Sequence, residues 1–233
     1  MCGRIIQAAG PLRYKLVDGL DVRDSRLSKL PRHYNGAPSQ EFLVIRQNHR
    51  TAERSLDLLK WGLVPNWCRE AKPQLKPINA KAEKVATTRM FAESYARRRC
   101  IVPVDGFFEW RSTKGGRQPY AIAMKDGSPF GLAGLWDNWK DPASGEWVRT
   151  FTIITVPAND LVASVHDRMP AILKPADYDR WLGVEPDPRD LLALFPSGAM
   201  TMWPGLPRVN AAQNDEPSLL DRVPESANNV AGG

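Results

Sequence analysis

The sequence predicts an α+β fold in which short helices flank a barrel-like core of short strands. Twenty Pro and 17 Gly divide the chain into short elements, and few long periodic apolar runs remain, which argues against a helical bundle. Short runs of β-branched and aromatic residues recur between turns rich in Gly, Pro, Asp and Ser, a spacing typical of sheet-rich barrels. The 233 residues suffice for one sizeable core, and we find no internal repeat or composition break.

A segment with no clear strand signal precedes the first predicted strand. Residues 11–40 are polar and mixed, and we interpret them as a short helix or loop followed by a linker. The strands expected after it are Phe42–Ile45, a strand from Leu58 that ends at a Gly/Pro turn, Cys100–Val104, Phe107–Trp110, Pro119–Met124, Phe130–Trp136, Thr150–Val156 and a final strand near Trp203–Asn210.

Helical signals are short and lie in the second half of the chain, with one exception. Residues Ala80–Arg99 contain helix formers with apolar residues at roughly helical spacing, and the segment ends in three arginines that suit a helix C-terminus. Asn159 or Asp160 is expected to cap a short helix that runs through Ala163. Two more short helices are expected at Lys174–Leu182 and Pro188–Phe195. We therefore predict one domain over residues 2–213 and a disordered, polar tail over residues 214–233.

Composition and charge narrow the class of protein. The net charge of +6 favours a polyanionic partner. The three cysteines form no CxxC pair, so a disulfide framework or a metal site is not expected, and a reducing cytoplasm fits best. The chain has neither the apolar core of a signal peptide near its start nor a run of 18 apolar residues, so we expect no membrane span.

Cys2 directly follows the initiator Met. Removal of Met1 would make Cys2 the N-terminal residue, with an α-amine and a thiol on one residue. Their model-peptide pKa values are about 7.7–8.0 and about 8.5, so modest tuning makes either group reactive. A 1,2-aminothiol reacts with an aldehyde to give first an imine and then a thiazolidine. Many proteins carry Cys at position two without such chemistry, so the other residues must support it.

Two further segments carry polar groups in an unusual setting. Asn79-Ala80-Lys81-Ala82-Glu83 alternates an amide, a cation and a carboxylate, which either cap a helix or face a ligand. Glu109 lies among three aromatic residues, where a desolvated carboxylate has a raised pKa; the alternative is an exposed Glu on the polar face of a strand.

His166 is the best general acid/base candidate among the three histidines, because it lies in a constrained loop between an apolar segment and Pro170, beside Asp167 and Arg168. His33 and His49 lie in polar surroundings and are expected at the surface. Trp61 and Trp67 flank a Gly/Pro turn; they either fill the core or stack on nucleobases.

These segments together resemble the SOS response-associated peptidase (SRAP) family of abasic-site processing proteins. The matching stretches, from Met1 to about Asn214, are MCGR, WGLVPNW, NAKAE, RRRCIVPVDGFFEW, FGLAGLW, TIITVPAN and SVHDRMP. The resemblance implies a single domain with a barrel-like core, a basic groove for single-stranded DNA and a catalytic Cys2 that attacks the ring-opened aldehyde of an abasic site. The implied product is a covalent DNA–protein thiazolidine crosslink that protects the lesion.

By the same resemblance, Asn79, Glu109 and His166 complete the active site, and no cofactor or metal is required. Lys81 stands where the family also uses Arg, which changes a bidentate contact into a point charge. The expected partner is single-stranded DNA that contains abasic sites, bound by a cytoplasmic, nucleoid-associated monomer. The residues expected to contact that DNA are Arg4, Trp61, Trp67, Lys81, Arg89 and Arg168.

Two other functions stay open at this point. A noncovalent single-stranded DNA-binding module would use the basic and Trp residues without Cys2. An N-terminal-nucleophile peptidase would use Cys2 with its own amine as base and would need no DNA. If the protein is a crosslinking enzyme, it could also remove Met1 autocatalytically and reverse the crosslink.

Overall fold

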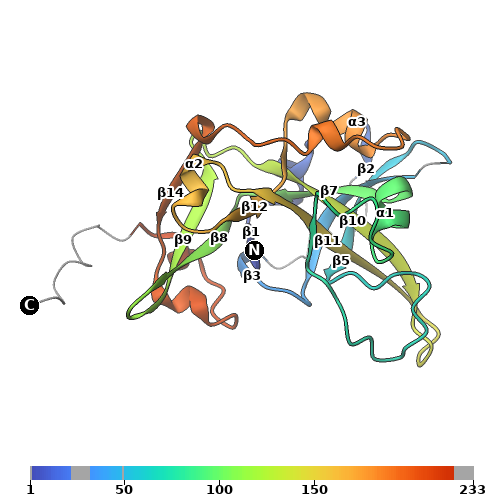
Figure 1. Ribbon diagram of the computed structural model, residues 1–233, viewed down its shortest axis with the longest axis horizontal. Helices are drawn as coiled ribbons and strands as arrows, with labels where there is room; N and C mark the ends of the chain where they lie inside the picture. The colour runs from blue at the N-terminus through green and yellow to red at the C-terminus, as the bar shows by residue number, and fades with distance from the viewer. Residues whose placement is uncertain (1, 22–31, 49, 223–233) are drawn as a thin grey trace, which may run out of the picture.

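The computed structural model describes residues 2–21, 32–48 and 50–222 and confirms a mostly sheet-built α+β fold with a barrel-like core (Figure 1). Two sheets dominate it, with strand orders β14-β9-β8-β1-β3 and β12-β11-β10-β7-β4-β5-β2. The strands are β1 (Arg4–Gln7), β2 (Leu20–Asp21), β3 (His33–Gly36), β4 (Glu41–Gln47), β5 (Arg54–Trp61), β6 (Asn79–Lys81), β7 (Arg99–Val104), β8 (Gly106–Thr113), β9 (Gly116–Met124), β10 (Phe130–Lys140), β11 (Trp147–Pro157), β12 (Arg168–Pro170), β13 (Ile172–Leu173) and β14 (Met200–Pro204).

The helices are short and lie around the sheets (Figure 1). The α-helices are α1 (Ala92–Arg97), α2 (Asp160–Ala163) and α3 (Tyr178–Leu182). The 3-10 turns are η1 (Pro11–Tyr14), η3 (Pro175–Asp177), η4 (Arg189–Leu191), η5 (Ser197–Ala199), η6 (Pro207–Asn210) and η7 (Pro217–Leu220).

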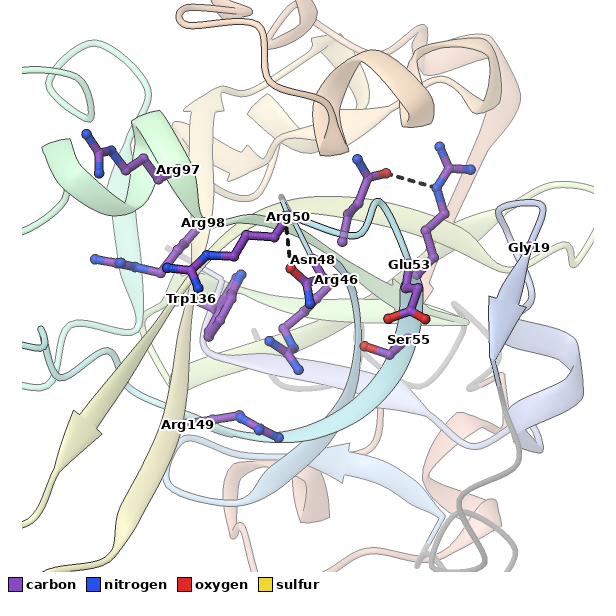
Figure 2. A pocket seen from close by; sticks show the side chains of 12 residues that line it. Gly19, Arg46, Asn48, Arg50, Glu53, Ser55, Arg97, Arg98, Trp136 and Arg149 are labelled. Atoms are coloured by element: carbon purple, nitrogen blue, oxygen red, sulfur yellow. Dashed lines mark hydrogen bonds between the residues drawn. The ribbon is translucent and has the colours of Figure 1, made fainter.

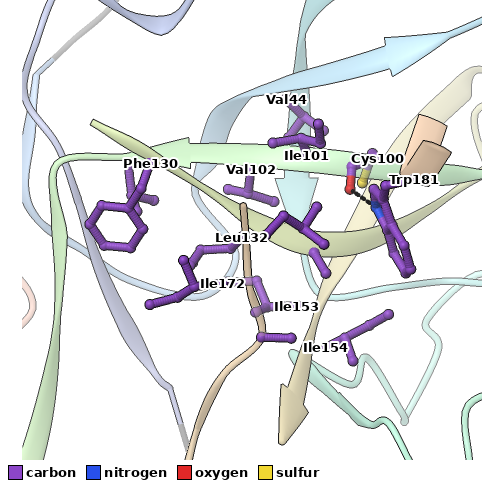
Figure 3. Packing of buried hydrophobic residues seen from close by; sticks show 14 of the residues in the cluster. Val44, Cys100, Ile101, Val102, Phe130, Leu132, Ile153, Ile154, Ile172 and Trp181 are labelled. Atoms are coloured by element: carbon purple, nitrogen blue, oxygen red, sulfur yellow. Dashed lines mark hydrogen bonds between the residues drawn. The ribbon is translucent and has the colours of Figure 1, made fainter. Parts of the chain in front are cut away.

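The larger sheet closes on itself into a barrel. Its strands β11, β10, β7, β4 and β5 pair in that order, and β5 then pairs back onto β11 in parallel, with Lys60 opposite Thr150 and Trp61 opposite Phe151. Closure removes the unpaired edges that an open sheet would expose. The barrel interior is filled by β-branched and aliphatic side chains, among them Val102, Leu132 and Ile153 (Figure 3).

The start of the chain runs into the smaller sheet, in the middle of the molecule (Figure 1). Strand β1 pairs antiparallel with β8, which places Arg4 opposite Phe108. The buried Gln7 side chain joins this sheet to the barrel, because its Nε2 donates to the carbonyl oxygens of Leu43 (3.0 Å) and Pro103 (2.7 Å). Both ends of β1 are therefore held in fixed positions, and Cys2 directly precedes this anchored strand.

Most predicted strands are confirmed, but the long helix predicted over Ala80–Arg99 is wrong. Only Ala92–Arg97 is α-helical, and Asn79–Lys81 instead forms β6, which pairs in parallel with β11. Pairing with a buried strand satisfies the backbone groups of these residues, and this tertiary effect outweighs their helix propensity. The predicted cap of α2 is confirmed, since the Asn159 side chain accepts from the N–H of Val162.

The region before residue 40 is more ordered than predicted. Strands β1, β2 and β3 lie where we expected no strand. His33 is buried rather than at the surface, with its ring 4.7 Å from that of Phe42 and its Nδ1 3.4 Å from Asp215 Oδ2. His49 lies outside the described residues, so its predicted exposure stays a prediction.

The end of the domain also differs from the prediction. The last strand is Met200–Pro204, and Pro207–Asn210 is a 3-10 turn. The predicted tail is wrong at its start, because Asp215 Oδ1 accepts the N–H groups of Tyr34 and Asn35, and Leu219 is fully buried. The ordered chain thus continues beyond residue 213 to at least residue 222, the last one described.

Candidate active site

Cys2 is fully buried, although it is next to the start of the chain. Its carbonyl oxygen accepts a hydrogen bond from Asn79 Nδ2 at 2.8 Å, and its Sγ lies 3.8 Å from the carbonyl oxygen of Arg4. Burial raises the pKa of the Cys2 thiol well above its usual range, and the negative charge of Glu109 adds to this shift. The thiol is therefore held in its protonated form at neutral pH.

Asn79 is positioned by sheet pairing. It opens β6, where its backbone is opposite Ile153 of β11, so the amide side chain has a fixed origin. While Nδ2 donates to Cys2, the buried Oδ1 of Asn79 accepts no hydrogen bond within the described part of the chain. Asn79 therefore fixes the position of Cys2 and keeps one acceptor available for a hydroxyl or amine.

Glu109 is 1% exposed on β8, between Phe108 and Trp110, which excludes the alternative of a solvent-exposed carboxylate. Burial raises its pKa from 4.5 to about 7, and the nearby charge of Asp167 contributes in the same direction. The interactions that lower the pKa of Glu109 are weaker than this effect of desolvation. A carboxyl group with a pKa near neutrality can both accept and return a proton under working conditions.

His166 is half-buried in the loop between α2 and β12. The backbone N–H of Arg168 donates to His166 Nδ1 at 3.0 Å, and burial lowers the pKa of the imidazole. The Asp167 carboxylate also lies 2.8 Å from Nδ1, but it could accept a hydrogen bond there only from a protonated Nδ1, which could not also accept from the Arg168 N–H. Because the lowered pKa favours the neutral ring, we assign the proton to Nε2 and leave Nδ1 as the acceptor.

The four predicted catalytic residues converge from distant parts of the sequence. Asn79 contacts Cys2 directly, Glu109 influences the Cys2 thiol through its charge, and Asp167 connects Glu109 electrostatically to the His166 loop. The described residues contain no group of three or more His, Cys, Asp or Glu side chains placed to hold a metal ion. Within this part of the chain, the site offers a thiol, an amide, a carboxyl and an imidazole.

Two of the residues predicted to bind DNA are held by protein groups. Arg4 donates to Asn35 Oδ1 at 2.8 Å and to the Val209 carbonyl at 2.9 Å. Arg168 forms a bidentate pair with Glu83, at 2.8 and 3.0 Å, and donates to the Thr155 carbonyl at 2.6 Å. These contacts give both arginines a structural role, whatever they bind in addition.

Lys81, Arg89 and Trp67 are exposed and accessible to a ligand. Lys81 is two residues after Asn79 on β6, so both side chains project from the same face of the strand. The Arg89 guanidinium lies 4.7 Å from the ring of Trp67, which is 39% exposed. A cation and an aromatic face thus lie together at the surface, the combination that binds unpaired nucleotides.

Trp61 is the predicted DNA contact that the structure contradicts. It is 1% exposed, its ring stacks on Phe151 with centroids 6.1 Å apart, and its Nε1 donates to the Ile78 carbonyl. Its strand is paired inside the closed barrel, so no face of the ring can reach a base.

Sequence reasoning missed the residues that support this site. Buried Asn35 holds Arg4 and also donates to the carbonyl of Asn214, while Glu83 binds Arg168 across 85 positions of the sequence. Glu83 was visible in the alternating segment after Asn79, but nothing local indicated its partner. Asn35 had no local signal, because its contacts depend on how the chain ends pack.

Fold and site together define a barrel-containing α+β protein with a cysteine-centred site next to its N-terminus. The chain belongs to the SOS response associated peptidase (SRAP) family, which it matches over residues 1–212. It is 35% identical to the abasic site processing protein YoqW of Bacillus subtilis (strain 168) over 193 residues, which cover 81% of this chain and 85% of that protein.

More distant relatives agree with this assignment. The abasic site processing protein YedK of Escherichia coli (strain K12) is 31% identical, over 86% of this chain and 87% of its own. HMCES of Gallus gallus, also named an abasic site processing protein, is 29% identical, over 94% of this chain and 77% of its own. A crystal structure of a Bacteroides thetaiotaomicron protein superposes with a TM-score of 0.84 at 27% identity, over 95% of this chain and all of that one.

Proposed function

We propose that this protein processes abasic sites in single-stranded DNA by capturing them covalently through Cys2. Its relatives in Bacillus subtilis, Escherichia coli and Gallus gallus are named abasic site processing proteins. The net charge of +6 suits a nucleic-acid partner. None of the helices in the described ranges is long and apolar enough to cross a membrane.

The proposed reaction starts once Met1 has been removed. The α-amine of Cys2 adds to the aldehyde carbon of the ring-opened deoxyribose, and the carbinolamine loses one water to give an imine. The Cys2 thiol then adds to the imine carbon, its proton passes to the nitrogen, and a five-membered thiazolidine results. The net change joins one aldehyde to one aminothiol with release of one water, so no oxidant or cofactor is consumed.

The protonation states of the site favour this order. Because burial raises the thiol pKa, the sulfur is a weak nucleophile before the substrate enters. The amine is therefore expected to attack first, and the thiol to add only to the more electrophilic imine. A neutral amine is needed for that first attack, and Glu109, with a pKa of about 7, can accept its proton.

The remaining groups have matching roles. Opening of the deoxyribose ring and loss of water both need a proton donor. His166, once it takes a proton on Nδ1 beside Asp167, can supply its Nε2 proton and return to the neutral ring. Asn79 holds the Cys2 carbonyl, and its Oδ1 can accept from a sugar hydroxyl. Removal of Met1 by the same groups and hydrolytic reversal of the crosslink, which retraces the imine step, form part of the proposal.

Exposed groups near Asn79 would hold the DNA strand. Lys81 would contact a phosphate next to the lesion, and Arg89 with Trp67 would hold a neighbouring nucleotide by charge and stacking. Arg4 and Arg168 would contribute positive charge from their anchored positions.

One observation carries this proposal: the buried Cys2, fixed by Asn79, lies within the electrostatic influence of a carboxyl whose pKa is near 7. A noncovalent DNA-binding module would have no use for this arrangement. The pairing of an aminothiol with a nearby proton acceptor is what imine and thiazolidine formation requires.

The test uses purified protein and a single-stranded oligonucleotide with one abasic site. We expect a band that survives a denaturing gel, on protein whose intact mass shows loss of Met1. Cys2→Ala should abolish the band, and Cys68→Ala, the matched control, should leave it, because Cys68 lies on the loop between β5 and β6, where its carbonyl accepts from Trp139 Nε1.

If Met1 is removed and no such band forms, covalent capture is refuted. Salt-sensitive DNA binding that is unaffected by Cys2→Ala would then support the noncovalent module. Turnover of peptides that needs Cys2 but not DNA would support the peptidase.

A further inference from the structure

A second concave site lies where β4 ends and β5 and β11 begin (Figure 2). It has a volume of about 730 Å³, within the range of small-ligand pockets. Cys2, Asn79, Glu109 and His166 are not among its lining residues. We propose that this arginine pocket binds phosphate groups independently of the candidate active site. Its arginines are Arg46, Arg50, Arg54, Arg97, Arg98 and Arg149.

Three of these arginines are fixed by carboxylates around the pocket. Arg46 Nε donates to Asp57 at 2.9 Å, and Arg98 binds Glu93 at 2.7 Å and Asp137 at 3.1 Å. Arg54 pairs with Asp179 at 2.9 Å. The four carboxylates offset the charge of the three arginines and hold their guanidinium groups in defined positions.

The other three arginines retain positive charge that a ligand can use. Arg50 and Arg97 are exposed and take part in none of the ion pairs found within the described residues. Arg149 is 48% exposed, and Asp57, the carboxylate it approaches to 3.9 Å, is already bound by Arg46. The excess charge of the pocket is therefore concentrated on its accessible arginines.

One further carboxylate offsets part of this excess, and an aromatic ring positions one of the cations. Glu53 is the carboxylate that lines it, and its Oε2 accepts from the Thr51 hydroxyl at 2.9 Å. Trp136 lies beneath the Arg46 guanidinium, 4.2 Å from the ring, and keeps that cation over an aromatic face. Figure 2 shows the labelled Arg46, Arg50, Arg98 and Arg149 side chains arranged around Trp136.

Phosphate is the ligand chemistry that fits these groups best. A guanidinium presents parallel N–H donors that match two phosphate oxygens, and it stays charged at any physiological pH. Several accessible arginines around one concave site suit a ligand with two or more phosphate groups. Such groups occur in a free polyphosphate or nucleotide and in the backbone of a nucleic-acid strand, and the experiment separates these two sources.

The experiment compares two variants that lose the same charge. One carries Arg50→Gln, Arg97→Gln and Arg149→Gln in the pocket. The control carries Arg13→Gln, Arg117→Gln and Arg189→Gln, three exposed arginines that do not line it. Calorimetry at low salt measures inorganic pyrophosphate and, separately, an unmodified oligothymidylate. These probes lack an aldehyde, so the outcome does not depend on the proposed crosslinking.

We expect pyrophosphate to bind the native protein and the control, and to bind the pocket variant about tenfold more weakly or worse, as loss of charge-assisted hydrogen bonds implies. If only the oligothymidylate responds in this way, with a shallower salt dependence in the pocket variant alone, the phosphates come from a strand. An equal loss of affinity in the pocket variant and the control variant, or no binding of either probe to the native protein, would overturn the proposal.

Discussion

Replacing Glu109 with Gln tests the buried carboxyl most directly. Gln keeps the volume of the side chain but cannot ionise. In the native protein the pKa rises from 4.5 to about 7, so between these pH values the folded state binds more protons than the unfolded state. Stability contributed by this group is then lost as pH rises. The full shift corresponds to about 3 kcal/mol, at about 1.4 kcal/mol for each pH unit.

The assay is chemical denaturation of both proteins at several pH values from 5 to 8. As the pH rises from 5 to 8, the unfolding free energy of Glu109→Gln should increase by about 2–3 kcal/mol relative to that of the native protein. Taking the difference between the proteins at each pH cancels the titrating groups that do not interact with Glu109. Intact mass must show the same N-terminus in both, and Glu41→Gln, an exposed position on β4, is the matched control.

A difference that stays flat with pH would show that Glu109 is not titrating between 4.5 and 7, and the argument for it as a proton acceptor would fail. The same variant should crosslink abasic DNA more slowly while its DNA binding survives. Loss of binding instead would show that Glu109 has a structural role.

The other predictions concern the anchoring and DNA-binding residues. Asn79→Ala removes the 2.8 Å hydrogen bond to Cys2, so single-turnover crosslinking at saturating DNA should slow about tenfold; an unchanged rate would contradict the positioning role. Trp67→Ala should weaken single-stranded DNA binding by about 1–3 kcal/mol with little change in melting temperature. Trp61→Ala should destabilise the fold by about 3–5 kcal/mol. Calorimetric scans in which Trp67→Ala lowers the melting temperature more than Trp61→Ala does would refute the assignment of Trp61 to the core and Trp67 to DNA binding. Arg168→Ala breaks the pair with Glu83, which should cost about 1–3 kcal/mol in denaturant unfolding and flatten the salt dependence of DNA binding; an unaltered salt slope would exclude a phosphate contact.

The sequence predicted the elements whose stability is set locally. The strand Cys100–Val104 and the capped helix at Asp160 are both found, because a β-branched run and a capping amide act within a few residues. The same reasoning failed at Asn79–Lys81, where pairing with β11 decides the conformation. The helix propensity of a segment takes no account of pairing with a strand more than 70 positions away in the sequence.

The site shows the same division between local and distant causes. The aromatic neighbours of Glu109 predicted its desolvation, and the carboxyl is buried. Phe107 shares its face of the strand, but Phe108 and Trp110 project from the opposite face into a second cluster, so the rest of the burial comes from the packing of the fold. Trp61 and Trp67 flank one turn and looked equivalent in the sequence. Closure of β5 onto β11 buries the first, whereas the second lies on a loop and remains exposed.

The difference between residues on paired strands and residues on loops matters for how the site works. The groups proposed for chemistry lie on paired strands or beside an anchored one, which gives them fixed origins: Asn79 on β6, Glu109 on β8 and Cys2 before β1. Trp67 and Arg89, which would hold the strand, lie outside regular sheet and can adjust to a flexible ligand. A rigid arrangement suits imine and thiazolidine formation, because both need one geometry at one carbon. Capture of a lesion in any sequence, by contrast, needs contacts that tolerate different neighbouring bases, and stacking and charge provide them.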